Sequence, residues 1–234
     1  MIISSVNNKI IKDTAKLNQK KYRDKESLFL GEGYNLFEEA KKANIVKYVF
    51  TTNNEINGEN IIYVTNEIMG KLTNSVSPQE IVTVCYKRLK EEIKDKVLLL
   101  DNIQDPGNLG TLLRSALAFG FETIILDNTV DIFSPKVIRS TQGALFHLNI
   151  IFDDILNFMS INNHIKYYGT SFNGTSLNDI QVTSKVGVIL GNEGKGVKQE
   201  ILDSLKENIT IKINNIDSLN VAVAGSIIMH HFCI

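Results

Sequence analysis

The second half of the chain alternates between short apolar runs and segments with helical periodicity. The apolar runs are rich in Val, Ile and Leu without polar alternation, which is typical of strands buried on both faces. Strands are predicted over residues 97–103, 122–127, 148–151, 166–171, 186–190 and 209–213. Helices are predicted over residues 107–120, 134–141, 153–161, 198–205 and 218–231. This alternation predicts an α/β fold with a parallel sheet covered by helices on both faces.

The first ninety residues follow a different pattern. One basic helix is expected over residues 7–23, and the later apolar segments VKYVFTT, IIYVT and EIVTVCYK predict a small α/β unit with its own sheet. The segment KRLKEEIKDK (87–96) is dense in alternating charges, which indicates a linker or a connecting helix. We therefore expect two domains, residues 1–92 and 93–234.

Composition excludes several classes of protein. With 43% apolar and 22% charged residues and a net charge of −1, the chain reads as an ordinary globular protein. No run approaches the ~18 apolar residues of a membrane span, and the N-terminus has no signal peptide, so a cytoplasmic protein without a membrane partner is expected. The two cysteines, Cys85 and Cys233, stand far apart and the histidines form no ligand pattern, so no metal site is expected.

A glycine-rich turn follows the predicted strand 186–190, in the stretch VILGNEGKGV (188–197). Its glycines are spaced G-x-x-G-x-G, and Lys195 is not followed by Ser or Thr, so neither a dinucleotide fingerprint nor a P-loop is present. The Glu193 carboxylate would also repel a pyrophosphate. The turn therefore predicts a ligand that is neutral or cationic at this point, and it disfavours a dinucleotide-dependent oxidoreductase.

The predicted helix 107–120 has one polar and one apolar side. Asn108, Thr111 and Arg114 follow an i, i+3, i+6 row, opposite a leucine-rich face. Long side chains lean toward the helix N-terminus, so Arg114 can reach the strand end where ligands of open α/β sheets bind. A solvated polar face is the alternative interpretation. In the last helix, Asp217, Ser218 or Asn220 could serve as the N-cap, and small residues such as Gly225 permit close packing.

Positive charge is concentrated at the N-terminus. Within the predicted helix 7–23, five basic residues are spaced three or four apart and form one stripe: Lys9, Lys12, Lys16, Lys20 and Arg23. Such a stripe is the pattern expected for contacts with RNA phosphates. A solvated helix face is again the alternative.

Three segments, taken together, resemble a known family. In order and spacing, DNIQDPGNLGTLLRSALAFG, VILGNEGKGV and ITIKINNIDSLNVAVAG are similar to the three motifs of the SpoU/TrmH family, the RNA ribose 2′-O-methyltransferases of the SPOUT class. The earlier segment SVNNKIIKDTAKLNQKKYRDKESLFLGEGYNLFEEA resembles the substrate-binding domain that precedes many such enzymes and shares its fold with certain ribosomal proteins. The resemblance covers nearly the whole chain.

This resemblance implies a fold, a cofactor and a set of site residues. It implies that a deep trefoil knot in the C-terminal domain binds S-adenosylmethionine, and that the protein is a homodimer formed through the knotted domain. The residues that match the polar active-site set are Asn108, Arg114, Glu193, Ser218 and Asn220. The residues that match cofactor contacts are Thr170, Leu190, Gly191, Gly194, Ile211, Leu219 and Asn220. Arg114 would act either as a general base or as a stabiliser of phosphate and alkoxide charge.

The function implied is S-adenosylmethionine-dependent 2′-O-methylation of RNA, with ribosomal RNA as the expected substrate. Transfer RNA is the alternative substrate, and a catalytically degenerate RNA-binding protein is the alternative from another class. Two departures from the family pattern concern the geometry of the cofactor loop: Ile211-Lys212-Ile213 stands where the family reads Ile-Pro-Met or similar, and the loop NNID is about one residue short. Of the two, only Lys212 supports the degenerate alternative. The intact polar set argues against degeneracy.

Overall fold

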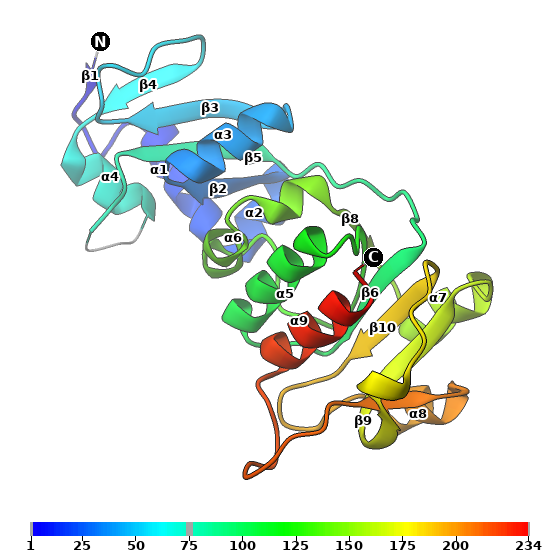
Figure 1. The fold of residues 1–234 in the computed structure, drawn as a ribbon. Coiled ribbons are helices and arrows are strands. Elements are labelled where there is room, and N and C mark those ends of the chain that lie inside the picture. Colours follow the sequence, from blue (N-terminus) through cyan, green and yellow to red (C-terminus); the bar gives the residue numbers. More distant parts are fainter. Residues whose placement is uncertain (1, 74–76, 234) are drawn as a thin grey trace. The chain divides into compact units, whose positions relative to one another are not determined.

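The computed structural model describes residues 2–73 and 77–233, which form two compact units (Figure 1). Unit 1 comprises Met1–Arg88 and Asp131–Phe146, and unit 2 comprises Leu89–Val130 and His147–Ile234. The main division thus falls close to the expected boundary after residue 92. Residues 131–146, however, were expected in the second domain and pack within unit 1. The charged segment 87–96 is extended rather than helical, and its Lys90 forms an isolated bridge with Asn149.

Unit 1 contains a mixed sheet with the strand order β1-β4-β3-β5-β2. Its strands are β1 (Ile2–Ile3), β2 (Leu28–Glu32), β3 (Val46–Thr51), β4 (Ile61–Val64) and β5 (Ile81–Tyr86). Its helical elements are α1 (Lys9–Ala15), η1 (Lys16–Asn18), α2 (Lys20–Glu26), α3 (Tyr34–Lys42), α4 (Asn66–Thr73), α6 (Pro135–Thr141) and the turn η2 (Ala144–His147). Phe50 faces a core shared with α1, η1 and α4, whereas its neighbour Val49 faces α3, so helices cover both faces of the sheet.

Residues 131–146 join unit 1 because their apolar side chains complete its core. Helix α6 contacts β2, and the rings of Phe133 and Phe146 lie 5.1 and 5.8 Å from that of Phe29. The Asp131 carboxylate lies 2.6 Å from the guanidinium of Arg23. None of these long-range contacts has a signature in local periodicity.

The basic helix expected over residues 7–23 is broken into three pieces. Helix α1 ends at Ala15, η1 follows, and Gln19 is extended before α2 begins. The Asn18 side chain holds this turn by donating to the carbonyls of Ala15 and Leu72. As a result Arg23 is buried, 3% exposed, and donates to the Leu17 carbonyl as well as to Asp131. The prediction that Arg23 belongs to an exposed RNA-binding stripe is therefore wrong.

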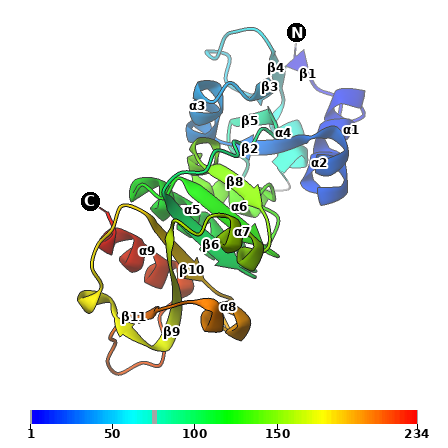
Figure 2. The same cartoon turned by 90° about the vertical axis from the view of Figure 1, so that its right-hand side faces the viewer.

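Unit 2 contains a sheet with the strand order β11-β9-β10-β6-β7-β8, and every pairing in it is parallel (Figure 2). Its strands are β6 (Lys96–Asp101), β7 (Thr123–Asp127), β8 (Asn149–Phe152), β9 (Lys166–Ser176), β10 (Val186–Leu190) and β11 (Asn208–Thr210). Its helical elements are α5 (Pro106–Ala118), α7 (Ile155–Ile161), η3 (Leu177–Asp179), α8 (Gln199–Ser204) and α9 (Val221–His231). The predicted parallel sheet is confirmed.

Two details of unit 2 differ from the sequence predictions. The strand predicted over 166–171 continues as β9 to Ser176, where it pairs with β11. The strand expected over 209–213 ends at Thr210, and residues 211–220 have neither helix nor strand. Because the pairing partner of β11 ends at Ser176, the chain after Thr210 has no strand beside it to continue the ladder.

Helices cover both faces of the parallel sheet, as predicted. Leu99 and Ile189 face a core that includes residues of α7 and α8. On the opposite face, α5 and α9 pack side by side (Figures 1 and 2). A Cβ on Gly225 would lie 2.5 Å from the end of the Leu190 side chain and 2.6 Å from that of Leu112, so any side chain here would displace both leucines. The predicted close packing by small residues is confirmed.

The buried Arg23–Asp131 pair generates a stability prediction. Arg23→Met removes the buried partner and leaves the partly buried Asp131 carboxylate, 15% exposed, without its cation, so we expect a loss of about 3 kcal/mol in the free energy of unfolding. Arg23→Met/Asp131→Asn should recover part of that loss. Urea denaturation of both variants, with the exposed Lys21→Met as control, measures this. A change in Arg23→Met no larger than that in Lys21→Met would contradict the structural role.

Candidate active site

The candidate site lies where β6 and β10 end. The two strands pair in parallel, with Leu190 beside Leu100. The loop 102–105 that follows β6 and the loop 191–196 that follows β10 therefore emerge from the same edge of the sheet. In open α/β sheets ligands bind at this edge, beyond the carboxyl ends of the strands.

A hydrogen-bonded chain of three polar side chains joins segments that are far apart in sequence. The Asn108 amide donates from Nδ2 to Glu193 Oε1 over 3.0 Å. Its Oδ1 accepts from Asn220 Nδ2 over 2.9 Å. The backbone N–H of Asp105 also donates to Glu193 Oε1, over 3.2 Å. The structure thus brings together Asn108, Glu193 and Asn220, which sequence analysis assigned to one site.

Helix caps hold two of these residues in place. Asp105 Oδ1 accepts from the N–H of Asn108 over 2.8 Å and caps α5, with Pro106 in its first turn. Asn220 Oδ1 accepts from the N–H of Ala222 over 2.9 Å and caps α9. Of the three candidate caps of the last helix, Asn220 is therefore the one used. Each cap fixes the start of a helix and a site amide at the same time.

The glycine-rich loop is organised by its asparagine. Asn192 Oδ1 accepts from the N–H groups of Gly194 and Lys195, and its Nδ2 donates to the Asn102 carbonyl over 3.0 Å. A Cβ on Gly191 would overlap the backbone atoms of Gly196 and Val197. Gly191 therefore serves first to let the loop close on itself, and its role against a cofactor remains a prediction.

Hydrogen bonding keeps the Glu193 carboxyl ionised. Partial burial acts to raise its pKa, but the hydrogen bonds from the Asn108 side chain and from nearby backbone N–H groups outweigh burial, and the pKa is lowered from its usual value. Glu193 is exposed on the surface of the loop. The site thus presents an anion at neutral pH, as expected for a turn that favours a cationic ligand.

An ion cluster that sequence analysis missed anchors the far end of the same loop. The Lys198 N–H donates to Asp101 Oδ2 over 2.8 Å, and its ammonium lies 3.2 Å from the carboxylates of both Asp101 and Asp127. Asp101 is 1% exposed. Burial lowers the pKa of Lys198, but the two carboxylates outweigh it and raise the pKa. The sequence signal was an aspartate at the end of each of two adjacent strands.

Asn102 is the other residue that sequence analysis passed over. It has a φ of 57°, in the left-handed region that asparagine tolerates better than most residues. Its N–H donates to the Asp127 carbonyl, and its side chain accepts from Gln104. The Asp-Asn pair directly after a strand was the available signal for this turn.

The structure does not join two of the predicted catalytic residues to this chain of hydrogen bonds. Arg114 is exposed on the polar row of α5 with Asn108, as its periodicity predicted. Ser218 is exposed in the segment 211–220. Neither side chain has a hydrogen-bond partner among residues 2–73 and 77–233, so their catalytic assignments stay predictions.

The predicted cofactor contacts are distributed around the ends of β9, β10 and β11. Leu190 and Gly191 are buried at the end of β10, and Gly194 is exposed. Thr170, half-buried in β9, donates to the Ile189 carbonyl over 3.2 Å. The remaining two, Ile211 and Leu219, are half-exposed in the segment after β11. Because Gly169 of β9 pairs with Ile189, Thr170 lies level with the end of β10.

Within the described part of the chain, no three His, Cys, Asp or Glu side chains are placed to hold a metal ion. Cys85 is a buried free thiol whose pKa is raised by burial, and Cys233 is a free surface thiol. Of the helices in the described ranges, none is long and apolar enough to cross a membrane.

Comparison with known proteins identifies both halves of the chain. Residues 95–230 match the SpoU rRNA methylase family, and residues 8–83 match the MRM3-like substrate-binding domain. A curated relative from Bacillus subtilis (strain 168), the 23S rRNA (guanosine(2553)-2′-O)-methyltransferase RlmP, is 35% identical, and the alignment covers 98% of each chain.

Solved structures resemble this chain over nearly its full length. An AdoMet-bound rRNA methyltransferase from Sinorhizobium meliloti superposes with a TM-score of 0.88 and 28% identity, covering 99% of this chain and 97% of that one. The SpoU methyltransferase AviRb from Streptomyces viridochromogenes shares the fold at a TM-score of 0.84 and 20% identity, covering 97% of this chain and 97% of that one in its complex with AdoMet. With two matched domains, a full-length relative and the three motifs in one site, the chain belongs to the SpoU rRNA methylase family.

Proposed function

We propose that this protein is an S-adenosylmethionine-dependent ribose 2′-O-methyltransferase that acts on 23S ribosomal RNA. The observation that carries the proposal is the bonded set of Asn108, Glu193 and Asn220 at the ends of β6 and β10, one residue from each of the three family motifs. Methylation of ribosomal RNA places the protein, on this proposal, in the cytoplasm.

The donor set at the strand ends fits S-adenosylmethionine. This cofactor carries a positive sulfonium, and the lowered pKa of Glu193 provides an anion beside it at neutral pH. Ile211 and Leu219 are apolar and half-exposed, as residues that contact the faces of an adenine must be. When bound, the cofactor supplies an electrophilic methyl group for the ribose 2′-oxygen. The loop 191–196 and the segment 211–220 would hold it, in the trefoil knot that membership of the SPOUT class implies.

On this proposal, Arg114 stabilises the negative charge that develops on the ribose 2′-oxygen of the substrate. A ribose 2′-hydroxyl becomes a good nucleophile only when its proton is removed or polarised. The Arg114 guanidinium is exposed on the helix row that leads to Asn108, and no partner within residues 2–73 and 77–233 occupies it. Because arginine normally stays protonated, its planar donors suit the stabilisation of a phosphate and of the developing alkoxide. Leu112 and Leu113 on the opposite side fix the helix to the core.

Two observations favour ribosomal RNA over the alternatives. The relative RlmP and the structure from Sinorhizobium meliloti, both named for ribosomal RNA, match this chain through both domains. A neighbour described for tRNA methylation covers 58% of the chain with a TM-score of 0.54 and 23% identity, and so supports the fold alone. Against the degenerate alternative, the bonded amide and carboxylate set is complete, and the Lys212 side chain is exposed rather than turned into the core.

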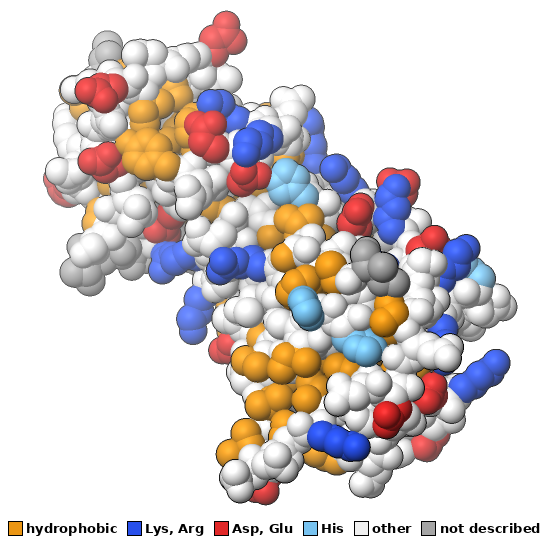
Figure 3. All heavy atoms as spheres, viewed as in Figure 1, with side chains coloured by type: hydrophobic (Ala, Val, Ile, Leu, Met, Phe, Trp, Pro, Cys, Tyr) orange, Lys and Arg blue, Asp and Glu red, His pale blue; other side chains and the backbone are white. Residues whose placement is uncertain are grey.

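We further propose that the active protein is a homodimer formed through unit 2. Val223 and Ile227 on α9 are 49% and 40% exposed, and hydrophobic side chains gather over α9 on the surface in Figure 3. Contiguous exposed apolar surface of this kind is typical of an interface. A partner in this position would explain why Arg114 and Ser218 have no hydrogen-bond partner among the described residues.

The Glu193 anion generates a prediction for cofactor affinity. Glu193→Gln keeps an acceptor for Asn108 but removes the charge, so S-adenosylmethionine should bind roughly fivefold more weakly, as expected for an exposed charge pair of ~1 kcal/mol. Because the Glu193 pKa is lowered, this difference should persist as the pH falls to the ordinary value of 4.5 and vanish only below it. Calorimetric titration at several pH values measures it, with Glu200→Gln as control. Equal affinities at neutral pH would exclude a role for the charge.

A second prediction concerns the chemistry of Arg114. Arg114→Ala should leave the fold and S-adenosylmethionine binding intact, because the side chain is exposed, while methyl transfer falls by at least ~10²-fold. Arg114→Lys should rescue little, since an ammonium lacks the planar pair of donors. Single-turnover methylation of 23S rRNA at saturating RNA and cofactor separates chemistry from binding. If Arg114→Ala methylates at the wild-type rate, the assignment is wrong.

Acidic substitutions on the exposed face of α9 test the proposed dimer. Val223→Glu/Ile227→Glu should shift the protein to a monomer and lower methylation, because two carboxylates cannot be desolvated in an apolar interface. Ile161→Glu adds a charge at another exposed apolar position, 69% exposed on α7, and should change neither property. Sedimentation velocity gives the assembly state. A fully active wild-type monomer would contradict the dimer.

A further inference from the structure

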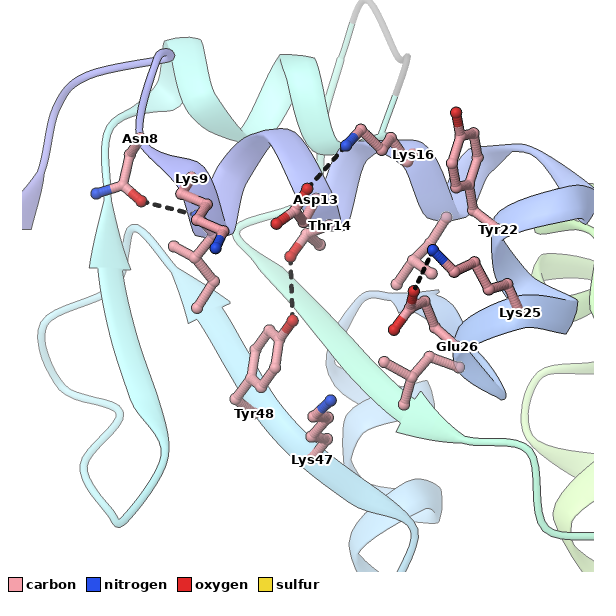
Figure 4. A pocket seen from close by; sticks show the side chains of 13 residues that line it. Asn8, Lys9, Asp13, Thr14, Lys16, Tyr22, Lys25, Glu26, Lys47 and Tyr48 are labelled. Carbon is pink, nitrogen blue, oxygen red and sulfur yellow. Dashed lines mark hydrogen bonds and ion pairs between the residues drawn. The ribbon is translucent and has the colours of Figure 1, made fainter.

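Unit 1 carries an open groove of about 680 Å³ between its N-terminal helices and one face of its sheet (Figure 4). Residues of α1, η1 and α2 form one wall, and Leu28 of β2 with Lys47 and Tyr48 of β3 form the other. The volume lies in the range of pockets that bind a small molecule or part of a polymer. No residue of the active site in unit 2 lines it.

The groove has an excess of positive charge. Four lysines line it, together with the two carboxylates of Asp13 and Glu26. Lys16 pairs with Asp13 at 2.8 Å, and Lys25 lies 3.8 Å from Glu26. Over the described ranges, neither Lys9 nor Lys47 has a carboxylate partner. Two ammonium groups, one on each wall, are therefore available to an anionic ligand.

Two tyrosine rings also line the groove. Tyr48 is held from both sides, because its hydroxyl lies 3.2 Å from the Thr14 hydroxyl and its ring packs edge-on against Phe50 at 5.5 Å. Tyr22 is half-buried against the same core, and Figure 4 shows it at the other end of the groove, beside Lys16 and Lys25. Both rings are partly exposed, and each has a groove lysine over it: Lys16 lies 5.8 Å from the centre of the Tyr22 ring, and Lys47 lies 5.7 Å from the centre of the Tyr48 ring. An anchored, partly exposed ring beside an ammonium is suited to stacking with a base next to its phosphate.

We infer that this groove binds an unpaired strand of the RNA substrate, an inference that rests on the proposed function. Phosphates require cations at intervals, and unpaired bases stack on aromatic rings irrespective of sequence. An acidic peptide would use the lysines but not the rings, and duplex RNA keeps its bases stacked away from them. The groove combines both features, with Lys9 and Lys47 on opposite walls and a tyrosine near each end.

The lysines that line the groove differ from the basic stripe predicted from the sequence. Lys9 and Lys16 line the groove, whereas Lys12 and Lys20 are exposed outside its lining. Lys20 is moreover paired with Asp24 at 2.7 Å. The buried Arg23 does not line the groove, whereas Lys47 does. Lys47 lies on a strand, so the helical periodicity of the N-terminal lysines could not predict it.

The test measures the affinity of the full-length protein for a labelled oligouridine of about ten nucleotides, within the usual site size for unpaired strands. Lys9→Gln/Lys47→Gln should weaken binding and reduce the slope of log affinity against log salt by about 1.4, or ~0.7 for each lost phosphate contact. Tyr22→Leu should weaken binding about 5- to 150-fold, the cost of one lost base stack. The matched control, Lys41→Gln/Lys42→Gln, removes two charges on α3, on the opposite face of the sheet, and should change neither quantity.

Failure of this inference and failure of the proposed function give different results. If the wild type methylates 23S rRNA while both groove variants bind oligouridine as tightly as it does, the groove assignment is overturned and the function stands. If the wild type binds no S-adenosylmethionine and methylates no RNA, the proposed function is wrong, whatever the groove binds. Binding of an oligoglutamate peptide in preference to oligouridine, or equal losses in the groove and control variants, would also overturn the groove assignment.

Discussion

The parallel pairing of β10 with β6 is the contact on which the rest of the site depends. It sets Leu190 beside Leu100, so the loops that follow the two strands leave the sheet at one edge although about ninety residues separate them in sequence. Glu193 can then accept from Asn108, and Asn192 can donate to the Asn102 carbonyl. A shift of one residue in this register would move one loop along the other by about 3.3 Å, which is enough to break these hydrogen bonds. The same strand pairing therefore stabilises the sheet and sets the geometry of the site.

Hydrogen bonds and ion pairs within the chain hold most of the site residues in place. Asn220 caps α9 with one atom of its amide and donates to Asn108 with the other. Lys198 closes the glycine-rich loop from its far end by bridging Asp101 and Asp127. Because such groups are held by the backbone and by buried charge, little conformational entropy remains to be lost when a cofactor binds. Arg114 is the exception, since no side chain within residues 2–73 and 77–233 holds it, and this suits a residue that contacts the RNA rather than the cofactor.

The sequence predicted the parts of this structure that depend on local periodicity. The parallel sheet, the polar row of α5 and the grouping of Asn108 with Glu193 all follow from patterns within single segments and from the family motifs. The features that escaped prediction depend on distant contacts. Arg23 fits a helical stripe, yet Asn18 breaks the helix by bonding to Leu72, and Arg23 turns inward to Asp131. The same holds for residues 131–146, which join unit 1 through aromatic contacts with Phe29 that have no local signal.

A chain with a net charge of −1 can bind a polyanion only if its charges are unevenly compensated. In this protein the carboxylates are largely engaged within each unit. Hydrogen bonds from Lys20 and Lys87 lower the pKa of Asp24 to about 2, and Lys198 engages the two aspartates at the strand ends. The cations without a carboxylate partner among the described residues include Lys9 and Lys47 in the groove and Arg114 near the active site. Since screening confines each field to about 10 Å at ordinary ionic strength, such local imbalance, rather than net charge, determines where a phosphate can bind.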